Sequence, residues 1–125
     1  MRIEASGLRQ VDQVWADYLN PSAWPTWAPQ IRAVHEITDP IEEGDRGVVH
    51  GPLLVRVPFR IVSVDESARR WTWRVGIGPL SVVLDHGVDE TATGSCAWAD
   101  VHAPRLAVLA YSPLARLALR RLVGG

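Results

Sequence analysis

The feature that most constrains the fold is an alternation of residue types between positions 53 and 61. One face of an extended chain would carry Leu53, Val55, Val57, Phe59 and Ile61, and the other would carry Leu54, Arg56, Pro58 and Arg60. A strand with one buried and one solvated face is typical of an antiparallel sheet. Pro58 has no amide hydrogen to donate, so we expect this strand to lie at an edge or to be bulged there.

Other segments repeat the same two-residue period and are separated by turn-forming residues. Around Trp71, Trp73 and Val75 the intervening residues are polar, and Val82, Leu84, His86 and Val88 share one face of the next segment. Short strands at this spacing predict an antiparallel meander. The remaining predicted strands cover residues 1–5, 31–37, 47–50 and 95–101.

Two short helices are expected after the first strand. Apolar residues at helical spacing, from Val11 to Leu19, predict the first. Asn20-Pro21 ends it and can start the second, with Asn20 as N-cap, and Pro25 and Pro29 keep that second helix short.

A long helix is expected to follow Ala103-Pro104. Its polar residues form one narrow stripe, so we expect most of its surface to be covered. Pro113 should kink or divide the helix. The stripe consists of Arg105, Ser112, Arg116 and Arg120.

Composition limits the function classes. The chain has 125 residues, enough for one domain over residues 1–125, and its net charge of −1 argues against a nucleic-acid partner. Cys96 is the only cysteine, which excludes an internal disulfide and a Cys-rich metal site and fits a cytoplasmic location. No apolar run is long enough for a transmembrane segment, and no signal peptide is evident.

The order of these elements, with several short motifs, resembles the START/Bet v 1-like (SRPBCC) superfamily, and within it the bacterial polyketide cyclase/dehydrase-like branch. The resemblance implies an α+β helix-grip fold, in which a curved antiparallel sheet of about six to seven strands wraps a long C-terminal helix. The last helix is shorter than is usual in that family, which implies either a trimmed chain or a less closed pocket. The motifs are Val14-Trp15, residues 24–31, residues 44–47, Trp71-Thr72-Trp73, His86 and Thr93-Gly94-Ser95.

The resemblance also implies an internal pocket for a small hydrophobic molecule. Large aromatic side chains can serve either such a pocket or plain core packing. Our candidate ligand-binding residues are Trp24, Trp27, Ile31, Val57, Phe59, Trp73, Leu84, His86, Trp98 and Tyr111. We expect Trp98, with Cys96, to face the final helix.

His86 is the candidate catalytic residue. It shares a strand face with apolar neighbours, and a buried neutral imidazole can donate to a ligand carbonyl or take a proton. The alternative is a core histidine bonded to a neighbouring strand or to Tyr111. Asp85 precedes it, but neighbours on a strand point apart, so the two are not expected to form a dyad.

Other polar residues give weaker indications. Histidines 35, 50, 86 and 102 lack the spacing of a metal site, so no metal and no cofactor are expected. Arg56 and Arg60 fall on the polar face of their strand and are expected to be solvated.

Three functions remain open from the sequence. The first is binding of a polyketide, lipid or isoprenoid-like molecule. The second is cofactor-independent cyclase or dehydratase activity on such a molecule, with His86 moving a proton. The third is an interaction or dimerisation module that uses the apolar last helix without turnover.

Overall fold

A computed structural model describes residues 1–52 and 55–124. Within these residues the chain forms seven strands, three α-helices and two short 3-10 helices. In chain order the elements are β1 (Arg2–Gly7), α1 (Val11–Leu19), η1 (Pro21–Ala23), α2 (Trp24–Trp27), β2 (Ala33–His35), β3 (Arg46–His50), β4 (Arg56–Asp65), β5 (Arg70–Val75), η2 (Gly78–Leu80), β6 (Val82–Glu90), β7 (Ser95–His102) and α3 (Arg105–Gly124).

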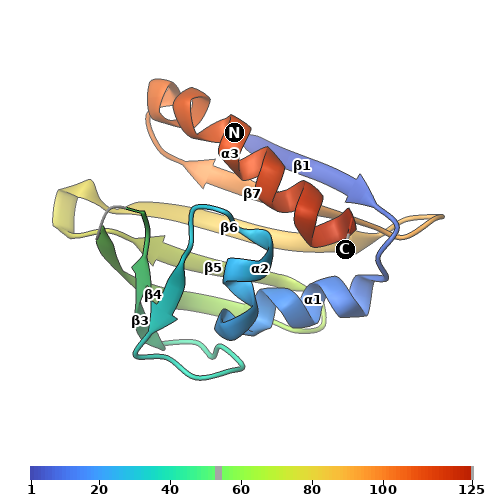
Figure 1. The fold of residues 1–125 in the computed structure, drawn as a ribbon, viewed down its shortest axis with the longest axis horizontal. Coiled ribbons are helices and arrows are strands. Elements are labelled where there is room, and N and C mark those ends of the chain that lie inside the picture. The colour runs from blue at the N-terminus through green and yellow to red at the C-terminus, as the bar shows by residue number, and fades with distance from the viewer. Residues whose placement is uncertain (53–54, 125) are drawn as a thin grey trace.

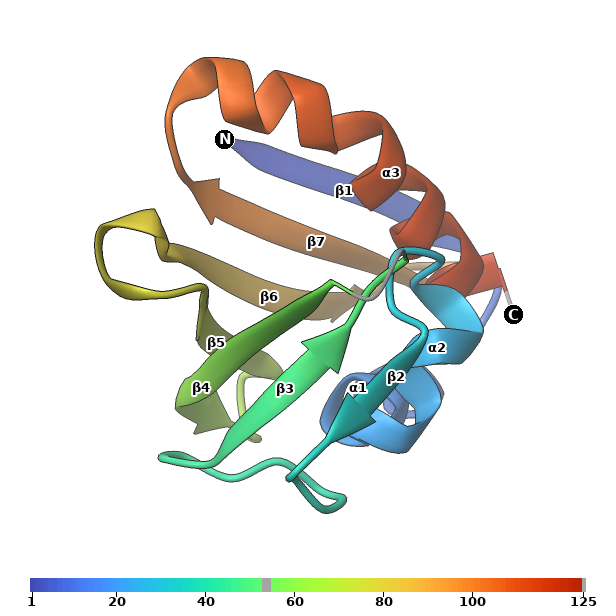
Figure 2. The same cartoon turned by 60° about the vertical axis from the view of Figure 1, so that its left-hand side comes forward.

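All seven strands form one antiparallel sheet in the order β1-β7-β6-β5-β4-β3-β2. The sheet curls, and α3 lies across its concave side, with α1 and α2 packed at one end (Figures 1 and 2). The predicted helix-grip α+β architecture is therefore confirmed. β2 and β1 are the two edge strands. Strands β2 to β7 are neighbours in sequence order, and β1 pairs with the last strand, β7.

The face of α1 predicted from its periodicity is the face it buries, with Val14 and Tyr18 fully covered. Tyr18 anchors both neighbours of this helix: its hydroxyl donates to the Trp98 carbonyl at 3.2 Å, and its own carbonyl accepts from the Trp24 indole at 2.9 Å. Pro21 starts the next helical turn as expected. The predicted Asn20 side-chain cap is wrong, because Asn20 makes no such hydrogen bond.

Two strand predictions need correction. The strand expected over residues 31–37 is confined to Ala33–His35, because Glu36 takes a left-handed conformation with φ of 66° and ends it. Pro58 does not mark an edge, since β4 lies between β3 and β5. The bulge in β4 lies between Ile61 and Ser63 and not at the proline.

The structure explains why a central strand tolerates Pro58. Its carbonyl accepts from the Gly76 amide at 2.9 Å, so its nitrogen faces the same neighbouring strand. The β4–β5 ladder ends at the pair formed by Phe59 and Val75, so Pro58 lies one residue beyond the end of the ladder. The missing N–H therefore breaks no hydrogen bond of the ladder. Leu53 and Leu54, which the alternation placed at the start of this strand, lie outside the described residues.

α3 is one helix from Arg105 to Gly124, so Pro113 does not divide it. Proline removes the hydrogen bond to the carbonyl four residues earlier, that of Leu109. The Ser112 hydroxyl donates to this same carbonyl at 3.2 Å, which explains why a residue of the predicted polar stripe is buried. The outer surface of α3 is less covered than expected, since Leu109, Leu114 and Leu117 are exposed. No helix among the described residues is long and apolar enough to cross a membrane.

Candidate ligand-binding pocket

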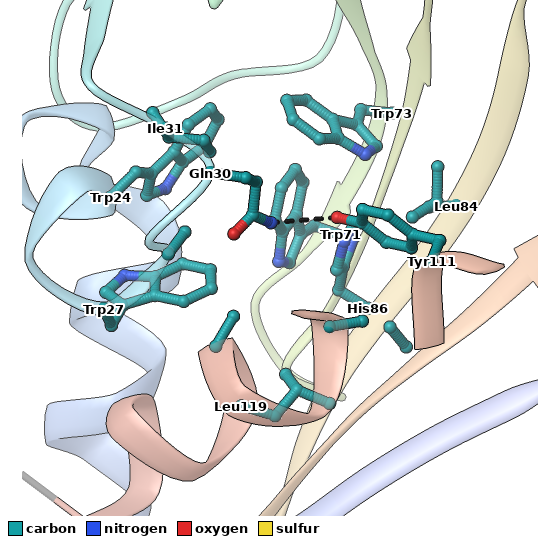
Figure 3. A pocket seen from close by; sticks show the side chains of 14 residues that line it. Trp24, Trp27, Gln30, Ile31, Trp71, Trp73, Leu84, His86, Tyr111 and Leu119 are labelled. Carbon is teal, nitrogen blue, oxygen red and sulfur yellow. Dashed lines mark hydrogen bonds between the residues drawn. The ribbon is translucent and has the colours of Figure 1, made fainter. Parts of the chain in front are cut away.

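The space between α3 and the concave face of the sheet contains a small inner chamber of about 50 Å³. Aromatic side chains from α2, β5 and β6 form its walls, and α3 closes it with small residues (Figure 3). Its lining comprises Trp24, Trp27, Ala28, Gln30, Ile31, Trp71, Trp73, Leu84, His86, Ala99, Tyr111, Ala115, Ala118 and Leu119.

A larger outer chamber of about 360 Å³, partly open to solvent, adjoins it beneath the first turns of α3. Trp73, Leu84 and Tyr111 line both chambers and form the partition between them. The other walls of the outer chamber are apolar and come from β4, the β5–β6 hairpin, β7 and α3. They consist of Val57, Val75, Gly76, Leu80, Val82, Val101, Ala103 and Ala107.

Aromatic stacking fixes the position of the inner wall. The Trp71 ring lies parallel to the His86 imidazole with centroids 4.0 Å apart, and Trp24 stacks on Trp71 at 5.5 Å. Trp73 meets Trp24 edge-on at 5.3 Å and contacts Phe59 at 5.1 Å. Rings held on several sides in this way lose little further freedom when a ligand binds, so the chamber is preorganised.

Gln30 and Tyr111 connect the two sides of the pocket. The Gln30 amide nitrogen, from the loop after α2, donates to the Tyr111 hydroxyl of α3 at 2.9 Å (Figure 3). Burial raises the pKa of Tyr111, and the hydrogen bond from Gln30 opposes this rise. The hydroxyl therefore stays protonated at neutral pH and retains a proton to donate.

His86 points into the pocket as its strand face predicted, and it is 7% exposed. Burial lowers its pKa to about 3, opposed by a hydrogen bond to the backbone of Trp71 and by the charge of Asp85. The imidazole is therefore neutral at pH 7. Asp85 lies on the opposite sheet face, where it pairs with Thr72 and with His102 Nε2 at 2.8 Å, so the expectation that Asp85 and His86 form no dyad is confirmed.

Most predicted site residues lie together in this space. The inner chamber is lined by Trp24, Trp27, Ile31, Trp73, Leu84, His86 and Tyr111, and Val57 lines the outer chamber. Phe59 lines neither chamber. It is buried behind Trp24 and Trp73, with which it is in ring contact, so it supports the wall and does not face a ligand.

Trp98 is the one predicted site residue that the structure places on the wrong side. Ala99, its neighbour on β7, lines the pocket, so Trp98 faces away from it. Its ring lies across Gly87, where a Cβ would come within 2.3 Å of it. The guanidinium groups of Arg2 and Arg70 lie over the ring at 4.1 and 4.6 Å from its centroid.

Sequence reasoning missed several lining residues, among them Trp71 and Gln30. Trp71 shares the strand face of Trp73, and this alternation was the signal that could have placed it in the pocket. Gln30 lies in a loop between α2 and β2, and no periodicity pointed to it. Ala115 and Ala118 were overlooked because small residues on α3 leave space for the chamber instead of filling it.

The remaining polar candidates lie outside the pocket. Arg56 and Arg60 are exposed, as predicted. The His35 and His50 rings on β2 and β3 are 4.2 Å apart by centroid. Within residues 1–52 and 55–124, no group of three or more His, Cys, Asp or Glu side chains is arranged to hold a metal ion.

Comparison with known proteins identifies the fold. Ara h 8.0201 superposes with a TM-score of 0.73 at 12% sequence identity, over 98% of this chain and 93% of its own. DynU16, from the dynemicin biosynthetic locus, gives 0.79 at 18% identity, and the match spans 98% of this chain but 45% of DynU16. Protein MLL2253 from Mesorhizobium loti gives 0.76 at 14% identity, over 98% and 93% of the two chains.

By sequence, no family model matches the chain, and no curated protein is significantly similar to it. At identities this low, the structural likeness establishes fold alone. The chain has a Bet v 1-like helix-grip fold, so the resemblance to the START/Bet v 1-like (SRPBCC) superfamily is confirmed at the level of fold.

Proposed function

We propose that this protein binds a small hydrophobic molecule of the polyketide, lipid or isoprenoid-like class in the pocket beneath α3. The observation that carries the proposal is the outer chamber, whose volume of about 360 Å³ and apolar walls suit such a molecule. The fold supports the same proposal, since DynU16, which has a similar fold, belongs to the dynemicin biosynthetic locus.

The state of His86 favours binding over turnover. A general base or acid is most effective when its pKa lies near the working pH. Burial lowers the pKa of His86 to about 3, so its imidazole is a poor proton carrier at pH 7 but a good neutral hydrogen-bonding group. Cyclase or dehydratase activity with His86 as catalytic residue stays a prediction.

A matched pair of strand variants tests the binding site. Val82 lines the outer chamber, whereas Val83 follows it on β6 and faces the other side of the sheet. Titration with the neutral fluorophore N-phenyl-1-naphthylamine should show binding to the wild-type protein. We expect Val82→Trp to weaken binding at least about tenfold by filling the chamber, and Val83→Trp to change it less than about twofold. Equal effects of the two substitutions would place the fluorophore elsewhere.

A second candidate function is interaction through the outer surface of α3, because Leu109, Leu114 and Leu117 are exposed there. Native mass spectrometry of protein purified from its own host separates the two candidates. A monomer that carries a small organic molecule supports the binding function and identifies the ligand class. A dimer without a bound molecule supports the interaction module.

A further inference from the structure

Four polar atoms in the wall of the inner chamber are buried and have no hydrogen-bond partner within the described part of the chain. They are the indole nitrogens of Trp27, Trp71 and Trp73 and the Gln30 amide oxygen. Buried polar groups in native proteins nearly always have a partner, so each exception requires an explanation. Four exceptions around one chamber point to a common partner that binds there.

The indoles of Trp24 and Trp98 differ from the unpartnered indoles around the inner chamber, either in hydrogen bonding or in position. Trp24 lies in the same aromatic cluster, yet its indole donates to the Tyr18 carbonyl at 2.9 Å. The fold therefore supplies an acceptor to one indole of this cluster, that of Trp24, and none to Trp27, Trp71 and Trp73. Trp98 also has an unpartnered indole nitrogen, but it lies alone on the opposite face of the sheet, so a single unpartnered indole is no sign of a ligand.

The unpartnered groups are mainly donors. An indole nitrogen can donate and cannot accept, so Trp71 and Trp73 require an acceptor. Trp71 stacks on His86 with ring centroids 4.0 Å apart, and in Figure 3 the Trp73 nitrogen lies on the side of its ring that faces Tyr111. Turning the Gln30 amide over would exchange which of its two atoms bonds Tyr111 and would still leave the other unpaired.

The chamber is also uncharged. Its lining contains no Arg, Asp or Glu among the described residues. Tyr111 keeps its proton because burial raises its pKa, and His86 is neutral because burial lowers its pKa. An ionised carboxylate placed there would lose its hydration without gaining a counter-charge, whereas a neutral carbonyl would lose much less.

We propose that the ligand enters the inner chamber head-first with a neutral oxygen acceptor, of the ketone or quinone carbonyl class, which Trp71 and Trp73 bind by their indole N–H groups. This inference rests on the proposed function and adds the chemical class of the ligand. A chamber of about 50 Å³ accommodates a head group of a few atoms, and the apolar body then occupies the outer chamber.

Three probes with the same naphthalene body and heads of equal size test this assignment: 2-acetylnaphthalene, 2-isopropenylnaphthalene and 2-naphthoate. Isothermal titration calorimetry on the full chain should give the ketone the lowest Kd and the carboxylate the highest. We expect Trp71→Phe to reduce the preference for the ketone over the hydrocarbon, measured as the ratio of their two Kd values, by about fivefold to tenfold. Trp73→Phe serves as a second variant if Trp71→Phe does not fold.

Trp98→Phe is the matched control, because it removes an equally unpartnered indole N–H outside the pocket, and the ketone preference should persist in it. Equal wild-type affinities for ketone and hydrocarbon, or a preference for the carboxylate, would overturn the assigned head group while the binding function stands. Failure of all three probes and of N-phenyl-1-naphthylamine to bind would instead overturn the proposed function together with this inference.

Discussion

The two chambers of the pocket share a partition but are built from different parts of the fold. The inner chamber is enclosed by the aromatic core, where Trp24 and Trp71 are 1% and 2% exposed. The outer chamber lies between the β5–β6 hairpin and the start of α3, where Leu80 is 83% exposed. The comparison indicates that the inner chamber is fixed by the same contacts that stabilise the fold, whereas the outer chamber has at least one wall residue, Leu80, that contributes little to the buried core.

The largest difference should appear when one wall residue of each chamber is truncated. Trp71→Ala removes a ring stacked on both His86 and Trp24, so we expect it to lower the free energy of unfolding by about 3–5 kcal/mol. Leu80→Ala removes a mostly exposed side chain and should change it by less than about 0.5 kcal/mol. Urea denaturation followed by circular dichroism measures both values. Similar decreases in the free energy of unfolding for the two variants would contradict the proposed difference between the two chambers.

A pH dependence of intermediate size should come from the inner chamber. His86 has a folded-state pKa of about 3 against an ordinary value of 6.5, so between these values the unfolded chain binds the proton more readily. Stability is therefore complete above pH 6.5 and falls as the pH decreases toward 3. At about 1.4 kcal/mol per pH unit, the loss reaches about 2 kcal/mol at pH 5.

His86→Gln provides the control for this pH dependence, because it removes the titrating group while Asp65, Asp85 and Asp100 remain. The pKa of each of these carboxyl groups is lowered, so their contribution is lost only in stronger acid. Urea denaturation at several pH values should therefore show a flatter profile for the variant between pH 7 and pH 5. An unchanged slope would mean that the pKa of His86 is not lowered in the folded protein.

The pocket residues also differ in how far the sequence could predict their positions. Alternation along β5 and β6 placed Trp73, Leu84 and His86 on one face, because a strand has a strict period of two. Trp98 was misplaced because an aromatic residue on a strand gives no sign of which face is concave, and the neighbouring Ala97 and Ala99 are small enough to be overlooked. The Gln30–Tyr111 bond joins a loop to a helix 81 residues away, and local patterns cannot predict such a contact.

The smallest expected effect concerns the partition between the chambers. Tyr111→Phe removes the hydroxyl that accepts from Gln30 and leaves a buried amide donor without its partner, so the free energy of unfolding should fall by about 1–2 kcal/mol. Gln30→Leu in the same background removes the stranded donor as well, and the double variant should recover part of that loss. A double-mutant cycle by urea denaturation measures the coupling. Strictly additive losses would mean that the hydrogen bond contributes little to holding α3 against the loop after α2, and that the partition rests on ring packing alone.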